Sequence, residues 1–246
     1  MSIDLDRITH PLRLAKGSHQ PGSGKGCAMN VISYINGDTK ITDYPECSAR
    51  PLAALVQMCN DQLAGPDGFL SPENSVLVLD LGWKTVGTAG VSDAVHALWI
   101  ADMLDSPEWG AVRFADEVGA VAIREIADLH RQAASGQVPF AWAAWSAAWS
   151  AAESAAESAA GYACSPARSA AESRAWSAAW SAAESVAESA AWSGALIEFT
   201  RQSITRWREL ADLDPETEID AADINSALAR IHDAGFMCVE SKEAEE

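Results

Sequence analysis

The sequence expectation for the fold starts from residues 141–196, which read AWAAWSAAWSAAESAAESAAGYACSPARSAAESRAWSAAWSAAESVAESAAWSGAL. This stretch repeats a four-residue unit, Trp or Glu followed by Ser-Ala-Ala, and it contains six of the ten tryptophans of the chain. Alanine is the strongest helix former and glutamate is close behind, so the repeat predicts helix. The run GYACSP at 161–166 interrupts it, because proline cannot continue a helix. We therefore expect an antiparallel helical hairpin over residues 138–210.

The tryptophans of this hairpin allow two interpretations. They could form a stacking surface for bases or sugars, or they could cover the alanine-lined seam between the helices. We favour the second, because stacking grooves for nucleic acid combine aromatic side chains with Lys and Arg, which are almost absent here. Ser and Glu recur in every turn, so no window reaches the roughly 18 apolar residues of a membrane span. The hairpin therefore predicts neither a nucleic-acid partner nor a membrane.

Composition limits the class of protein further. The 246 residues have a formal net charge of −18. Residues 211–246 contain 11 of the 35 acidic residues and two of the 17 basic ones, so half of the net charge lies there. Such a chain avoids nucleic acid and attracts basic partners. The start of the sequence has no apolar signal segment, and five irregularly spaced cysteines do not suggest a disulfide framework, so we expect reduced thiols in a cytoplasm.

The flanking segments predict a mainly α-helical protein in three parts: an N-terminal helical domain over 1–137, the hairpin over 138–210, and an acidic helix and tail over 211–246. Apolar spacing and capping residues favour helices over 27–35, 51–63, 92–105, 112–134 and 220–233. In the helix over 112–134 we expect an inward face made of Phe114, Val118, Val121, Ile126 and Leu129. A short helix could open at Ser71, whereas VLVLDL at 76–81 is the only β-like run.

The glycine-rich segment over 22–26 resembles a phosphate loop only superficially. The nucleotide-binding motif needs glycine where this chain has His19, and Ser or Thr where it has Gly26. We therefore do not expect nucleotide binding there.

Chemistry-bearing residues gather near the N-terminus, and three interpretations remain open. His19, Cys27 and Cys47 could bind zinc, with Asp43 or Cys59 as a fourth ligand, although the usual close ligand pairs are absent. Cys27 could instead be a nucleophile, with His19 as base and Asp43 orienting the imidazole. The third interpretation, which we favour, is that these residues define the fold, because free cysteine is often buried and Asp and His often bond to loop backbone.

The same residues point to a family resemblance. The pattern GSH…GKGCAMNVISYING…TDYPECSARPLAALVQMCNDQL resembles a group of hypothetical proteins common in actinomycetes and their phages. The motifs of the group are G-x-H…G-x-C-x-M, D-x-P-x-C and N-D-x-L, followed by an Ala/Trp-rich run. The matching positions in this chain are His19, Cys27, Met29, Asp43, Pro45, Cys47, Asn60 and Asp61. A looser match lies at Trp99, Ala101, Asp102 and Leu104. The resemblance covers most of residues 14–210 and implies a shared fold without implying an activity.

From the sequence we expect a non-enzymatic scaffold or interaction protein that binds a protein partner or forms a homo-oligomer, with no cofactor. The first alternative is a metal- or thiol-dependent protein, with zinc as the possible cofactor, centred on His19, Cys27 and Cys47. The second alternative is an acidic decoy that mimics DNA. That alternative ranks last, because the hairpin is nearly neutral and only the tail is strongly acidic.

Overall fold

A computed structural model describes residue 10 and residues 12–19, 23–115, 117–137, 193–214 and 219–231. Within these ranges the protein is mainly helical, as the sequence predicts, and the extended pairings are two isolated bridges, Ala15 to Phe69 and Ser48 to Val86. The predicted hairpin over 138–192, with its six tryptophans, lies outside the described residues. The described part of the predicted 138–210 segment is α8 (Ser193–Leu210), which ends at the expected residue.

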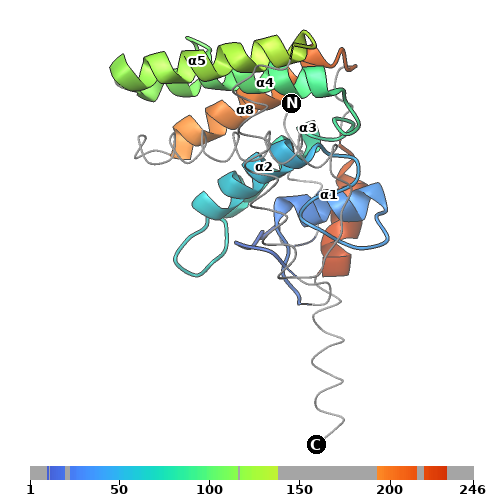
Figure 1. The fold of residues 1–246 in the computed structure, drawn as a ribbon. Helices are drawn as coiled ribbons and strands as arrows, with labels where there is room; N and C mark the ends of the chain where they lie inside the picture. Colours follow the sequence, from blue (N-terminus) through green and yellow to red (C-terminus); the bar gives the residue numbers. More distant parts are fainter. Residues whose placement is uncertain are drawn as a thin grey trace, which may run out of the picture. The chain divides into compact units, whose positions relative to one another are not determined.

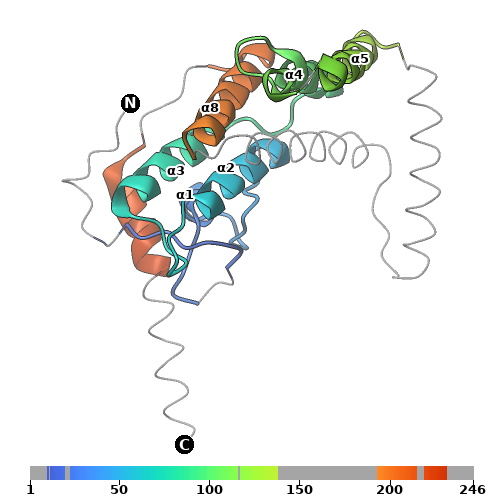
Figure 2. The ribbon, with the colours of Figure 1, turned by 90° about the vertical axis from the view of Figure 1, so that its left-hand side faces the viewer.

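The backbone divides into two compact units, residues 1–90 with 190–246 (unit 1) and residues 91–189 (unit 2). In unit 1, helices α1 (Ala28–Asn36), α2 (Arg50–Gln62) and α3 (Pro72–Lys84) pack on one another, and α8 packs on α2 and α3. Figures 1 and 2 both show α2 and α3 side by side. The first part of the chain therefore builds its core with a helix that comes more than a hundred residues later.

Capping and stop residues mark several helix ends of unit 1. The side chain of Ser71 caps α3 by accepting a hydrogen bond from the backbone N of Asn74 at 3.2 Å. The helix α1 ends at Gly37, whose φ of 78° is easily reached only by glycine. Along α8 the buried residues recur at helical spacing: Leu196, Phe199, Thr200, Ser203, Ile204 and Trp207.

The β-like run over 76–81 is helical, so this sequence expectation is wrong. Ser71 caps the helix, Pro72 occupies its first turn, and the run continues without a break to Lys84. Its buried residues, Ser75, Val78, Leu79, Leu81 and Gly82, fall on one helical face. Gly82 allows α1 to approach closely, since a Cβ there would lie 3.3 Å from the side chain of Ile32. Tertiary packing of this face outweighs the β preference of valine.

A further helix over 221–231 also belongs to unit 1. The carboxylate of Asp220 accepts from the backbone N of Ala222 at 2.9 Å and so caps the helix, as predicted. Ile231 lies against the N-terminal loop, because a Cβ on Gly26 would come within 2.9 Å of its Cδ1. The backbone N of His10 donates to Asn225 at 3.4 Å. This helix is thus part of the unit 1 core.

Unit 2 contains α4 (Asp93–Asp105), a 3-10 helix η2 (Ala111–Phe114) and α5 (Glu117–Ala134). The helices α4 and α5 lie along each other in Figures 1 and 2. Arg131, near the end of α5, bonds both carboxylate oxygens of Asp105 at the end of α4, at 2.6 and 2.8 Å. In place of the single long helix expected over 112–134, the chain forms two elements, η2 and α5. Val121 and Ile126 do not face inward as expected, because they are 52% and 45% exposed.

Candidate functional site

The candidate nucleophile Cys27 stands at the start of α1 and is completely buried. Its thiol donates to Oδ1 of Asp43 at 3.4 Å, and the side-chain amide of Asn30 donates to the same oxygen at 2.9 Å. The backbone N of Cys27 donates to Oδ1 of Asn30 at 3.1 Å. Cys27, Asn30 and Asp43 therefore form a closed hydrogen-bonded group, which we call the Cys27 cluster.

The environment of the Cys27 cluster opposes thiolate formation. Burial is the largest cause that raises the pKa of the Cys27 thiol, and the negative charge of Asp43 raises it further. The backbone hydrogen bonds around Asn30 lower the pKa by less than these two effects raise it. Because the thiolate is the reactive species, this arrangement keeps Cys27 protonated and weakly nucleophilic.

The Asn60–Asp61 pair of α2 ties the N-terminal loop to α1. Asn60 is fully buried, and its amide accepts from the backbone N of Ala28 at 3.3 Å and donates to the carbonyl of Ala15 at 2.9 Å. The neighbouring carboxylate of Asp61 accepts from the backbone N of Gly17 at 2.8 Å. Asn60 therefore satisfies backbone groups that would otherwise be buried without a partner, and Asp61 adds a bond to the half-buried Gly17.

The other candidate ligands have different surroundings. The half-buried thiol of Cys47 lies 3.7 Å from the hydroxyl of Ser48. Cys59 is fully buried between α2 and α8, where its thiol lies 3.2 Å from the hydroxyl of Thr200. His19 is half-buried, and its Nε2 atom is enclosed with no hydrogen-bond partner among the described residues. The three thiols thus have separate neighbours.

A metal site is not assembled within the described residues. No group of three or more His, Cys, Asp or Glu side chains there is arranged to hold a metal ion. The structure joins Cys27 to Asp43, and it adds Asn30, which the sequence interpretation missed. Asn30 had a local signal, since it stands three residues after the helix start, where a polar side chain reaches back to the capping residue. Zinc binding by His19, Cys27 and Cys47 stays a prediction.

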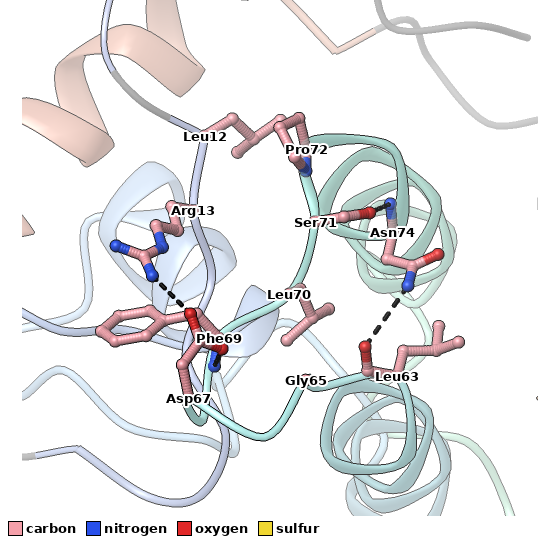
Figure 3. A pocket seen from close by; sticks show the side chains of 10 residues that line it. All are labelled: Leu12, Arg13, Leu63, Gly65, Asp67, Phe69, Leu70, Ser71, Pro72 and Asn74. Atoms are coloured by element: carbon pink, nitrogen blue, oxygen red, sulfur yellow. Dashed lines mark hydrogen bonds and ion pairs between the residues drawn. The ribbon is translucent and has the colours of Figure 1, made fainter.

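A separate pocket of about 610 Å³ opens in unit 1 between the N-terminal segment, the α2–α3 loop and the start of α3. Its apolar wall consists of Leu12, Leu63, Leu70 and Pro72. In Figure 3 the Arg13 guanidinium and the Phe69 ring lie together on one side, and Ser71 and Asn74 lie on the other. The sequence interpretation did not identify this pocket, because its walls come from segments about fifty residues apart.

Backbone hydrogen bonds fix the shape of this pocket. The backbone N of Leu70 donates to the carbonyl of Leu14 at 2.9 Å, and that of Gly65 donates to the carbonyl of Phe69 at 2.7 Å. The side-chain amide of Asn74 donates to the carbonyl of Leu63 at 3.3 Å, which satisfies a group at the end of α2 (Figure 3). The pocket thus lies between the end of α2, the start of α3 and the N-terminal segment that pairs with Leu70.

Among the described helices, none has both the length and the apolar composition needed to cross a membrane. Comparisons of the chain with protein-family models, with curated proteins and with solved structures gave no match.

Proposed function

We propose that the protein is a non-enzymatic interaction protein that acts in a bacterial cytoplasm, in an actinomycete or one of its phages. The observation that carries the proposal is the exposure of two large apolar side chains of α5, Val121 at 52% and Ile126 at 45%. Large apolar side chains in water favour association with another apolar surface. The partner is a second copy of the chain or a different protein.

The state of the candidate chemical groups also supports this proposal. Cys27 and Asp43 are used in hydrogen bonds to each other and to Asn30, and Asn60 and Asp61 bond to backbone. A catalytic thiol needs access to substrate and a lowered pKa, whereas Cys27 is fully enclosed and its pKa is raised. In this proposal these residues stabilise the fold through their hydrogen bonds.

Association is tested by light scattering of the purified protein and by affinity capture from actinomycete lysate, with mass spectrometry of what is retained. The double variant Val121→Ser/Ile126→Ser should lose the oligomer or the retained partner. The double variant Arg124→Ser/Gln132→Ser changes exposed residues of the same helix and should keep it. A monomer that retains no partner contradicts the proposal, as does loss of association in both double variants.

A metal- or thiol-dependent protein is the second candidate, and it is favoured by one observation. Nε2 of His19 is enclosed without a hydrogen-bond partner among the described residues, and imidazole nitrogen is a common zinc ligand. Elemental analysis of the purified protein decides between the candidates. Stoichiometric zinc that disappears in Cys27→Ser would establish the metal protein, whereas native labelling that leaves Cys27 unmodified would support the structural role.

A further inference from the structure

The pocket beside Phe69 is lined by the positively charged side chain of Arg13, which has unused hydrogen-bond donors. Nη2 of Arg13 donates to Oδ2 of Asp67 at 2.6 Å, and the guanidinium carbon lies 4.0 Å from the centroid of the Phe69 ring. No other partner of the Arg13 side chain occurs among the described residues. Because a guanidinium has five N–H donors in a fixed fork, Arg13 can bind a further acceptor without leaving Asp67.

Asp67 cannot take the corresponding role for a cation as readily. Its Oδ2 accepts from Arg13, and its Oδ1 accepts from the backbone N of Phe69 at 3.1 Å. Both carboxylate oxygens are therefore engaged, and they hold Arg13 in place over the ring. Each carboxylate oxygen keeps a second lone pair, whereas the unused N–H donors of this pair are on the guanidinium, so the pocket offers hydrogen bonds to an anion.

The local charge agrees with this assignment. The chain has a net charge of −18, yet residues 12–26 contain Arg13, Lys16 and Lys25 and no acidic residue. The ammonium of Lys25 lies 5.4 Å from the centroid of the same Phe69 ring. The side chains of Arg13 and Asp67 are 54% and 59% exposed, so water screens their ion pair and it opposes a competing anion only weakly.

Much of the remaining lining is apolar, and the pocket has the size of a small-molecule site. Its volume of about 610 Å³ lies within the range of roughly 300 to 1,000 Å³ that is usual for ligand pockets. Leu12, Leu63, Leu70 and Pro72 form a wall that would contact a hydrocarbon body. We propose that this pocket binds a small monocarboxylate with an apolar body, whose carboxylate bonds to Arg13 and whose body packs on this wall. The proposal does not depend on the proposed function, because the pocket lies in unit 1 and α5 lies in unit 2.

The test uses the full chain and 4-phenylbutyrate as the probe, with the neutral 4-phenylbutyramide as the matched compound. Amide NMR shifts are followed during titration of wild type, Arg13→Gln and Lys16→Gln. Lys16 is exposed, has the same charge and does not line the pocket. We expect saturable shifts centred on residues 12–13 and 65–74, much weaker binding of the amide, and affinity weakened about tenfold in Arg13→Gln, a change that corresponds to about 1.4 kcal/mol.

Lys16→Gln should bind the acid nearly as well as wild type does. Equal weakening by the two substitutions would show general charge attraction and would overturn the proposal. Equal affinity for the acid and the amide, or the absence of saturable shifts up to the solubility limit of the probe, would overturn it as well. None of these results changes the expected association through α5, so the two proposals fail separately.

Discussion

Two cysteine side chains of unit 1, Cys27 and Cys59, are completely buried, and each thiol has a polar neighbour. Burial raises the pKa of both thiols, and for Cys59 it outweighs the lowering effect of Thr200 and gives a pKa of about 12. Both groups therefore stay protonated near neutral pH. They pack as small apolar side chains, and the thiol of Cys27 bonds to Asp43 whereas that of Cys59 bonds to Thr200 and to the carbonyl of Leu196.

The raised pKa of Cys59 predicts a loss of stability at alkaline pH. Between the ordinary thiol pKa of 9.0 and the folded pKa of about 12, the unfolded chain ionises first and binds fewer protons than the folded protein. The contribution of this thiol to the free energy of unfolding is therefore fully present below pH 9.0. It falls as pH rises through this window, by up to about 1.4 kcal/mol per pH unit. Cys59→Ala should remove that part of the slope, as urea unfolding at several alkaline pH values would measure.

Thr200→Val is the matched control for Cys59→Ala. It removes the hydroxyl partner of the thiol and keeps the thiol buried between α2 and α8. The slope with pH should persist in this variant. Identical slopes in wild type and Cys59→Ala would show that Cys59 does not titrate in this way.

Gly110 has no room for a larger side chain. A Cβ at this position would lie 2.5 Å from the backbone N and 2.7 Å from the backbone O of Ser106. Neither backbone atom can rotate away, so Gly110→Ala should destabilise the protein by about 2 kcal/mol or more. Gly194→Ala has open space around it and replaces a helical glycine, so it should raise the thermal midpoint slightly. Midpoints that move in the same direction for the two variants would contradict this account.

The residues of the Cys27 cluster also show what the sequence could and could not predict. The residue types at His19, Cys27 and Asp43 indicated either a site or a fold-defining group. Sequence separation of 16 residues says nothing about contact, so the bond between Cys27 and Asp43 needed the fold. The roles of Asn60 and Asp61 were hidden for the same reason, because their partners are backbone groups more than thirty residues away.

Elements with clear end signals could be predicted well. Ser92 caps α4 and Asp220 caps the helix over 221–231, as the sequence indicated. The burial of α5 was predicted less well, since apolar spacing favoured Val121 and Ile126 as inward residues. Ala127 and His130 are buried instead, so the inward face is turned from the expected one. Periodicity finds a helix, but the neighbouring helix decides which of its faces is covered.

The helix over 221–231 can be tested as an element of the unit 1 core. Ile224 is fully buried, so Ile224→Ala should lower the free energy of unfolding by about 2 to 5 kcal/mol through lost burial and a residual cavity. Ser226→Ala changes an exposed position of the same helix and should have little effect. Urea unfolding followed by circular dichroism measures both. Equal stability of the two variants would show that this helix does not contribute to the core.

At the scale of the whole molecule, acidic residues outnumber basic ones by 35 to 17. Mutual repulsion of these charges destabilises the compact state, and salt weakens this repulsion. The thermal midpoint at neutral pH should therefore rise between about 0.01 M and 0.15 M sodium chloride, as the Debye length falls from about 30 Å to about 8 Å. Near the isoelectric point of about 4.5 the same salt step should have a much smaller effect. A midpoint that falls with salt at neutral pH would contradict this expectation.

The division of the chain into units has a consequence for the order of events during synthesis. Unit 1 is assembled from residues 1–90 and 190–246, with unit 2 between them. The buried faces of α1, α2 and α3 therefore emerge from the ribosome long before α8 and the 221–231 helix exist to cover them. The described helices of unit 2, α4, η2 and α5, follow one another in sequence, so their mutual contacts can form early, whereas unit 1 keeps part of its apolar surface open until translation has passed residue 231. A nascent chain stalled before α8 should consequently expose a surface that chaperones recognise.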